Sequence, residues 1–315
     1  MGFTTADLLT RAKLYGWSPA SSGSVTDTEF LQLADDELQS YVFPRVLEAK
    51  GEYRVATSDA SITAGQTVYR LPTRAHAGRL RDVLYIDTAG NAVSLPMMDP
   101  EELGTRFSSY ALESMPRAWY FQDSNVVVWP AQSTTRGTLR RTYFMRPGTL
   151  VATSACAKIT TIGAASSGGA GYRRFTCANV PTSVTTSVTV DMVRADGGFE
   201  TSHIDMAVHA VVTGAAGTID IAETALTVGN ISVGDYISIA GEACIPQVPD
   251  ICHPWLARRV ATLFLETQQD DGAMKASVAA ADRMEQRILE TLTPRVDGEP
   301  KTIVPTFSPI RSLFW

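Results

Sequence analysis

Residues 241–269, GEACIPQVPDICHPWLARRVATLFLETQQ, are where the pattern of this chain changes for the last time. The prolines in the first half end a region of short alternating runs. The second half places Leu256, Val260, Leu263 and Phe264 on one face of a helix. A helical region therefore begins after a long β region, and the fold depends on what precedes both.

The opening of the chain, residues 1–52, is also predicted to be helical. Leu8 and Ala12 share a face in TTADLLTRAKLY. Thr26, with Glu three positions later, matches a capping box ahead of FLQLADDELQSYVFPRVLEAKG, in which Pro44 is expected to kink or end the helix. Because helices occur at both ends, we expect residues 1–52 and 249–298 to pair in one helical bundle.

Between the helices, residues 53–149 change to a period of two. YRVATSD, QTVYRLP, RLRDVLYID and NAVSLP are predicted strands, and RAWYFQDSNVVVWP is predicted to be a hairpin that turns at QDSN. TLRRTYFMRP adds another strand, and Asp99 is placed to cap a short helix that begins at Pro100. We expect one antiparallel sheet of five or six strands with this short helix.

Residues 150–248 are rich in Ala, Gly, Thr, Ser and Val and poor in charge. Runs such as SVTVDMV, HIDMAVHAVVTG, GTIDIA and DYISIAG predict an all-β insertion, and the loop GAASSGGAG is expected to be a hairpin tip rather than a phosphate loop. The predicted fold is therefore α+β: a helical bundle, an antiparallel β domain, an all-β insertion and an extended C-terminal arm, residues 299–315.

Composition restricts the classes of function. The chain has 315 residues, of which 44% are hydrophobic, and a formal net charge of -6, which argues against binding nucleic acid over the whole surface. Its apolar runs are shorter than the roughly 18 residues that span a bilayer, so no membrane contact is expected. The N-terminus lacks the basic region and apolar core of a secretory signal.

The cysteines favour buried free thiols over a zinc site, because they form no C-x-x-C pair. Cys156 and Cys177 could form a disulfide if the protein were secreted, and nothing in the sequence indicates that it is. His203, Asp205 and His209 could line part of a strand, but a metal site there would need ligands from elsewhere. We expect no metal and no cofactor.

Catalytic candidates are weak. The chain has no G-x-S-x-G elbow. Paired carboxylates could serve glycoside hydrolysis, and Asp35 with its two acidic neighbours, or Glu48 with Glu52, could supply them. Both groups fall on the polar side of a predicted helix, where a solvated surface is the better explanation. We assign no catalytic residue.

Arginines gather in RAHAGRLRDV and RGTLRRTYFMR. Arg140 and Arg141 are adjacent on a predicted strand, so their side chains should lie on opposite faces of the sheet. Arg79, Arg81, Arg140 and Arg141 are candidates for an interface with an acidic surface, or for a basic band that contacts DNA phosphates.

The C-terminal stretch EPKTIVPTFSPIRSLFW is apolar, and its prolines exclude a continuous helix. Burying its apolar side chains contributes at most roughly 10–20 kcal/mol, while ordering each residue costs about 1–2 kcal/mol. The segment therefore needs further contacts, which we expect from a groove or a sheet edge on another subunit or another protein. The alternative is that it wraps back over its own helical bundle. The residues expected to make this contact are Lys301, Ile303, Val304, Phe307, Ile310, Arg311, Leu313, Phe314 and Trp315.

Several segments in order resemble the head-to-tail adaptor proteins of short-tailed bacteriophages. They are the first helix pair, LRDVLYID, DPEEL, GDYISIAGEACIPQVP leading into HPWLARRVA, and LTPRVDGEPKTIV before the arm. The resemblance covers most of the chain outside residues 150–248 and rests on the order and character of these segments. In that family a twelve-subunit ring lies under the portal, the C-terminal arm docks onto the portal, and the tail nozzle attaches below.

The resemblance implies a non-enzymatic structural protein of the virion neck, made in the host cytoplasm. Its partners would be the portal, a tail nozzle or tail tube protein, further copies of itself in a dodecamer, and DNA contacted without sequence specificity during ejection. The arm would be Lys301 to Trp315. Two alternatives stay open: a virion-associated peptidoglycan hydrolase, and a capsid decoration or fibre-base protein.

Overall fold

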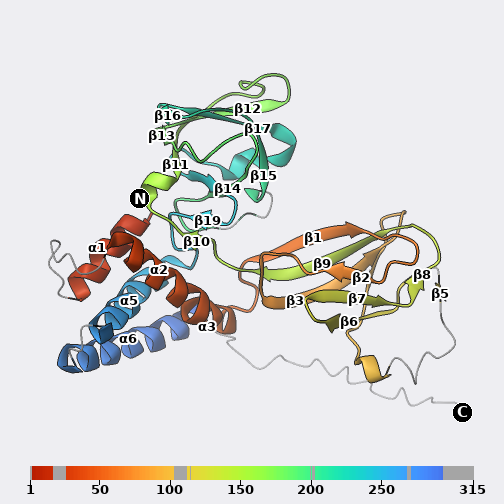
Figure 1. The fold of residues 1–315 in the computed structure, drawn as a ribbon, viewed down its shortest axis with the longest axis horizontal. Coiled ribbons are helices and arrows are strands. Elements are labelled where there is room, and N and C mark those ends of the chain that lie inside the picture. The colour runs from red at the N-terminus through yellow and green to blue at the C-terminus, as the bar shows by residue number, and fades with distance from the viewer. Residues whose placement is uncertain are drawn as a thin grey trace, which may run out of the picture.

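The computed structural model describes residues 2–16, 26–102, 112–113, 115–198, 200, 203–267 and 271–293. Figure 1 shows three parts: helices from both ends of the sequence, a β-barrel above them, and a group of β-strands to the right. The class is α+β, with helices and mainly antiparallel strands, as the sequence predicts.

Two helices begin with capping boxes, in which a threonine and an acidic residue exchange hydrogen bonds with the backbone of the first turn. Thr4 pairs with Asp7 at the first helix, and Thr26 pairs with Glu29 at the second, as the sequence predicts for the latter. The helical elements are α1 (Thr5–Tyr15), α2 (Asp27–Glu37), η1 (Leu38–Val42), α3 (Phe43–Ala49), α5 (His253–Thr267) and α6 (Asp271–Leu292).

The prediction that Pro44 ends or kinks its helix is wrong in position, because the chain stays helical through Pro44 to Ala49. The preceding turn, η1, is a π-helix, and the N–H of Phe43 donates to the carbonyl of Leu38, five residues back. Proline has no N–H and clashes with the carbonyl four residues earlier. A wider turn just before it accommodates that ring, so the irregularity lies before the proline rather than at it.

Helices from both ends of the sequence share one hydrophobic core. Phe30 of α2 packs against Phe264 of α5, with ring centroids 5.0 Å apart, and Trp255 lies edge-on to Tyr41. Each such side chain contributes about 1.5–3 kcal/mol when fully buried. The core also contains Leu8, Leu38, Val42, Phe43, Val46, Leu256, Val260 and Ile288.

The β-strands that follow α3 form two sheets that share a core, not the single sheet of five or six strands that the sequence suggests. The sheet order is β1-β9-β3-β4 in one and β2-β7-β6 in the other. Val83 and Leu139 of the first sheet pack with Tyr69 and Val126 of the second. Alternation along a strand reveals one buried face, but it does not reveal which sheet covers that face. We call this part the sandwich.

The hairpin at QDSN is confirmed, with Gln122 opposite Asn125 and a positive φ of 53° at Asp123. The strands of the sandwich are β1 (Val55–Ser61), β2 (Val68–Arg70), β3 (Ala75–Ile86), β4 (Ala92–Ser94), β6 (Ala118–Gln122), β7 (Asn125–Trp129) and β9 (Thr138–Met145). The short pair β5 (Leu112–Glu113) and β8 (Ala131–Gln132) lies beside them. Asp99 accepts a hydrogen bond from the N–H of Glu101, as expected for the cap of the short helix.

The strands after residue 150 include a closed barrel in the order β11-β12-β17-β15-β14-β18. Its interior is filled by buried side chains such as Ile159, Phe175, Ile219 and Ile237. Closure gives each of these six strands a neighbour on both sides. The six strands are β11 (Ala157–Ile162), β12 (Tyr172–Cys177), β14 (Thr189–Val193), β15 (Met206–Val212), β17 (Thr218–Ala222) and β18 (Tyr236–Ile239). The GAASSGGAG loop joins the antiparallel strands β11 and β12.

Two short strands connect the barrel to the rest of the chain. The strand β10 (Thr149–Leu150) lies before the barrel in sequence, and β19 (Glu242–Ala243) lies after it. They pair in parallel, with Thr149 opposite Glu242. A second short pair, β13 (Asn179–Val180) with β16 (Gly214–Ala215), lies within the barrel region.

Candidate functional site: the junction of three parts

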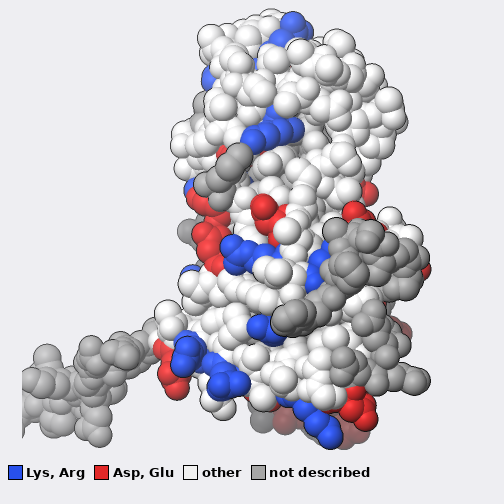
Figure 2. Space-filling model, turned by 90° about the vertical axis from the view of Figure 1, so that its left-hand side faces the viewer, with Lys and Arg blue, Asp and Glu red and all other residues white. Residues whose placement is uncertain are grey.

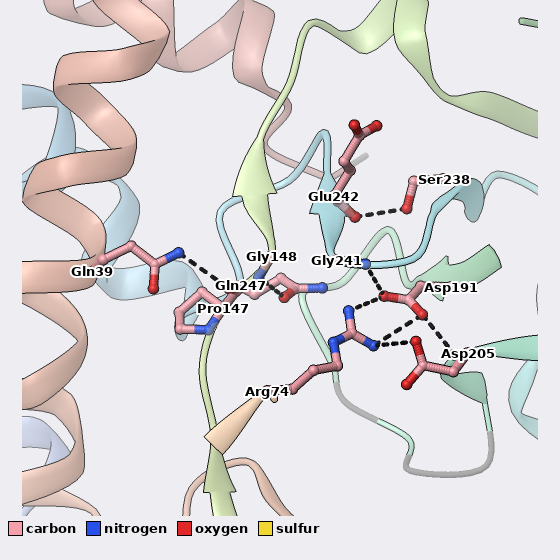
Figure 3. A network of polar contacts seen from close by, with 10 residues as sticks. All are labelled: Gln39, Arg74, Pro147, Gly148, Asp191, Asp205, Ser238, Gly241, Glu242 and Gln247. Carbon is pink, nitrogen blue, oxygen red and sulfur yellow. Dashed lines mark hydrogen bonds and ion pairs between the residues drawn. The ribbon is translucent and has the colours of Figure 1, made fainter. Parts of the chain in front are cut away.

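The helices, the sandwich and the barrel meet at a network of polar contacts that we call the junction (Figure 3). It is formed at the loop before β3, the segment between β9 and β11, and the segment between β18 and α5. The residues drawn there are Gln39, Arg74, Pro147, Gly148, Asp191, Asp205, Ser238, Gly241, Glu242 and Gln247.

Arg74 joins the sandwich to the barrel. It lies immediately before β3, and its guanidinium contacts both carboxylate oxygens of Asp191 on β14, with 3.1 Å between Nη1 and Oδ1. The same Nη1 is 3.4 Å from Oδ1 of Asp205, at the start of β15. The side chains of Arg74 and Asp191 are only 10% and 6% exposed. This buried, two-pronged ion pair fixes both the distance and the orientation of the two parts.

The barrel backbone supplies further donors to Asp191. The N–H groups of Asp205 and Gly241 each donate to its carboxylate at 2.9 Å. Burial of a carboxylate is costly unless its oxygens are hydrogen-bonded, and these donors meet that requirement. Burial by itself lowers the pKa of Arg74, but the hydrogen bond and the charge of Asp191 outweigh it, so the pKa is raised. Burial raises the pKa of Asp205, against the effect of Arg74.

The helices hold the linker between β9 and the barrel. Gln39 of η1 donates from Nε2 to the carbonyl of Pro147 at 3.1 Å, and Asp35 of α2 accepts from the N–H of Leu150 at 3.0 Å. On the other side, Gln247 accepts from the N–H of Gly148 at 2.8 Å. The linker is therefore bonded to the helices and to the returning chain at once. Burial raises the pKa of Asp35 despite these bonds.

The four arginines singled out in the sequence do not form one cluster of free cations. Arg140 makes a two-pronged bond to Asp59 across the β1–β9 pair, with both contacts at 2.8 Å. Arg141 points the other way: it is buried, and its Nη2 donates to Ser58 at 2.9 Å while Nη1 bonds the carbonyl of Arg70. The opposite orientation follows from strand alternation.

Arg79 and Arg81 lie on β3 and both are exposed. Arg81 forms an ion pair with Glu52 at 3.0 Å. Arg79 lies over the ring of Phe144, with its guanidinium carbon 5.9 Å from the ring centroid. Of the four arginines, these two present their charge most openly.

Four of the acidic side chains considered for hydrolysis are engaged in other contacts. Glu48 pairs with Arg45 at 3.1 Å, and Glu52 pairs with Arg81. Glu37 forms an ion pair with Arg259, and Asp35 belongs to the junction. They do not converge on one cleft.

The histidine region considered for a metal is separated by the fold. His209 stacks on Tyr172 of the barrel, with centroids 3.6 Å apart, while Asp205 turns toward Arg74. His203 is buried, and its Nε2 accepts from the N–H of Thr227 at 3.2 Å. Among the described residues, no group of three His, Cys, Asp or Glu side chains is arranged to hold a metal ion.

Charge is unevenly distributed over the surface. In Figure 2 the barrel, at the top, is mostly white, whereas acidic and basic side chains intermingle over the parts below. Several barrel charges are neutralised locally, since Arg174 bonds Asp220 at 2.7 Å and Arg173 lies 3.5 Å from Glu223. None of the helices within the described ranges has both the length and the apolarity needed to cross a bilayer.

The sequence did not reveal the junction, although it singled out some of its members. Arg74 stood in an arginine-rich run and Asp205 in a tentative metal group, but their contacts join residues 117 and 131 positions apart. Predicting such pairs requires knowing which residues lie close together in space. The periodicity of hydrophobic residues along one chain does not give that information. The arm from Lys301 to Trp315 lies outside the described residues.

Comparison with protein families decides the class. The family model described as SU10 adaptor protein matches residues 3–166, which is more than half of the chain. The chain belongs to the SU10 adaptor protein family. The match spans α1 to α3, the sandwich and the first barrel strand, and it ends in the loop between β11 and β12.

Membership of the SU10 adaptor family confirms the predicted relation to phage head-to-tail adaptors and supports a structural bacteriophage protein. Such an adaptor is a component of the virion neck and interacts with portal and tail proteins. No curated protein matches the chain.

Proposed function

We propose that this chain is the ring-forming adaptor that joins a phage portal to the tail and lines the passage for DNA. The observation that carries the proposal is the SU10 adaptor match over residues 3–166. In the ring, each subunit would contact its neighbours, the portal on one side, and a tail nozzle or tail tube protein on the other. Twelve copies are proposed, as in the adaptors that the sequence resembles.

A rigid subunit suits this role, and the junction supports it. An adaptor transmits load between two assemblies, so its parts must keep a fixed relative position. Arg74, Asp35 and Gln39 connect the three parts through hydrogen bonds of 3.0–3.1 Å. Each of these bonds joins segments more than a hundred residues apart in the sequence.

For the DNA passage we propose Arg79 and Arg81 as the principal contacts, with Arg140 as a further one. A basic side chain at a phosphate releases counterions, and it needs no base sequence to do so. Arg81 and Arg140 would exchange Glu52 and Asp59 for phosphate, which keeps any contact weak and allows DNA to slide. Arg141, which is buried against Ser58, would instead hold the sandwich in shape.

The arm is proposed to bind the portal. Its apolar residues include Phe307, Ile310, Leu313, Phe314 and Trp315. Aromatic side chains of this kind dominate the binding energy of interfaces when they fill pockets on a partner. Main-chain hydrogen bonds to a groove or sheet edge would offset the cost of ordering the segment.

The test is binding to purified portal by the full chain and by a chain that ends at Gly298. The shortened chain keeps every described residue, so it should fold with an unchanged circular dichroism spectrum and fail to bind. A second variant, Phe307→Ala with Trp315→Ala, keeps the length of the arm and should bind at least tenfold more weakly. Portal binding by the shortened chain at the affinity of the full chain would refute the role of the arm.

A further inference from the structure

The cysteines are all free and buried, as the sequence predicts, but their surroundings differ. Cys177 belongs to the core of the barrel, and Cys252 belongs to the core of the helices. Cys156 and Cys244 lie together in a third, small cluster between those two. The other buried members of that cluster are Val193, Tyr236, Ala243 and Ile245.

Cys156 and Cys244 lie where the chain enters and leaves the barrel. Cys156 follows the short helix η2 (Thr153–Ala155) and directly precedes β11. Cys244 directly follows β19. The whole barrel lies between the two cysteines in sequence, so they mark the two ends of its neck.

The backbone around both cysteines is fixed by hydrogen bonds. The N–H of Val151 donates to the carbonyl of Ala243 at 3.0 Å, which continues the pairing of β10 with β19. The N–H of Thr5, the first residue of α1, donates to the carbonyl of Cys244 at 2.8 Å. These bonds bring the entering and leaving segments side by side and dock the first helix on them.

The two cysteines pack in one buried cluster. A hydrogen bond between the side chains of Cys156 and Cys244, together with burial, raises the pKa of the Cys156 thiol. Because the thiolate is the reactive form, the raised pKa protects the reduced Cys156 thiol while the neck is closed. Oxidation therefore requires a brief opening of the neck, and the two cysteines return to one cluster when it closes.

We propose that Cys156 and Cys244 are a disulfide-forming pair that seals the neck of the barrel. The occasion for oxidation rests on the proposed function, because a virion protein made in a reducing cytoplasm is later released into an oxidising medium. This pairing replaces the one considered from the sequence, Cys156 with Cys177. Those two residues belong to separate clusters, and Cys177 is enclosed by barrel side chains.

The chemistry is thiol–disulfide exchange with a small-molecule disulfide such as oxidised glutathione. The thiolate of one cysteine attacks the glutathione disulfide, forms a mixed disulfide and releases one glutathione thiol. The second cysteine then attacks the protein sulfur of that mixed disulfide, closes the Cys156–Cys244 bond and releases the second glutathione. Two protein thiols are oxidised, and one glutathione disulfide is reduced to two thiols.

A bond at this position would hold the segments that enter and leave the barrel together when the junction opens. The loop that it closes contains the entire barrel, and the restriction of the unfolded chain increases with loop length. The bond adds no new contact between parts, so the reduced and oxidised proteins should share one fold. The two forms should differ in the stability of the barrel against unfolding.

The test uses the purified full chain, incubated with oxidised glutathione at pH 8 and then treated with iodoacetamide under denaturing conditions. We expect an intact mass lower by about 2 Da before alkylation, and one linked peptide pair that joins Cys156 to Cys244. Cys177 and Cys252 should both be alkylated. The melting temperature of the barrel should rise by at least about 5 °C and return on reduction.

Two serine variants complete the test. Cys244→Ser should abolish the link and the rise in melting temperature, whereas Cys177→Ser, at another buried thiol, should leave both unchanged. Glutathione adducts alone, no loss of mass after prolonged oxidation, or a link from Cys156 to Cys177 would overturn the proposal, and the wild-type mapping decides this even if a variant fails to fold. Portal binding, measured on the same oxidised and reduced samples, reports separately on the proposed adaptor function.

Discussion

Replacing Arg74 with alanine should uncouple the sandwich from the barrel. The variant removes the guanidinium that contacts both oxygens of Asp191 and lies 3.4 Å from Asp205. Asp191 keeps two backbone donors, the N–H groups of Asp205 and Gly241. However, Asp191 loses the positive charge that balances its own. Its side chain is only 6% exposed, so water cannot replace that charge.

The cost follows from burial. Removing one partner of a buried ion pair lowers the free energy of unfolding by about 3–5 kcal/mol, because the remaining charge is uncompensated. Arg140→Ala is the matched control, since Arg140 also makes a two-pronged bond, to Asp59. That pair is 40% and 45% exposed, so its loss should cost no more than about 1 kcal/mol.

Hydrogen exchange measures the effect at the junction itself. The amides of Asp205 and Gly241 exchange only when their bonds to Asp191 open. In Arg74→Ala they should exchange on the order of 10²- to 10³-fold faster, at about 1.4 kcal/mol per factor of ten. In Arg140→Ala their rates should change by less than about tenfold. Equal rates in the two variants would refute the claim that Arg74 holds the parts together.

Further outcomes follow from the fold. Phe264→Ala should lower the free energy of unfolding by about 3–5 kcal/mol and speed amide hydrogen exchange in α2 as well as in α5. Phe175→Ala should instead speed exchange of the barrel amides first. Burial lowers the pKa of His253 in the folded protein below its usual value of 6.5. The neutral imidazole therefore contributes its full stabilisation above pH 6.5, and this stabilisation is lost as the pH falls toward the pKa of the folded state. In urea titrations, His253→Gln should lose less free energy of unfolding below pH 6.5 than the wild type. Arg79→Glu with Arg81→Glu should slow DNA ejection without weakening portal binding, and an unchanged ejection rate would contradict the proposed DNA contact.

Elements whose cause is local could be predicted from the sequence. The capping box at Thr26 and the hairpin between Gln122 and Asn125 are both determined by residues within four positions of one another. Helices at both ends, with β structure between, followed from a change of hydrophobic period. The α+β class is correct for the same reason.

Features that depend on distant partners could not be predicted. Val83 and Tyr69 each alternate correctly along their strands, but only the packed structure shows that they lie in two sheets facing one core. Closure of the barrel depends on the pairing of β11 with β18, and the strands Ala157–Ile162 and Tyr236–Ile239 lie far apart in sequence. At Pro44 the sequence indicated the disturbance, but the π-turn that absorbs it lies in the preceding residues.

At the candidate site, too, local features could be predicted from the sequence and contacts between distant residues could not. Arginine-rich runs were visible, and adjacent residues such as Arg140 and Arg141 were expected on opposite faces. Their partners were not visible: Asp59 neutralises Arg140, whereas Arg74, from the same arginine-rich run as Arg79 and Arg81, carries the buried ion pair. Arginine density along the chain indicates available charge, and only the fold decides whether that charge is already paired.

The most direct test of the adaptor assignment is an electron microscopy structure of the full chain assembled on its portal. We expect a closed ring of copies at the neck, coaxial with the portal, around a passage that admits duplex DNA. Residues 301–315 should be ordered and buried against the portal surface. A chain bound to the outside of the capsid would contradict the adaptor assignment, and a ring whose arms make no contact with the portal would contradict the proposed role of the arm.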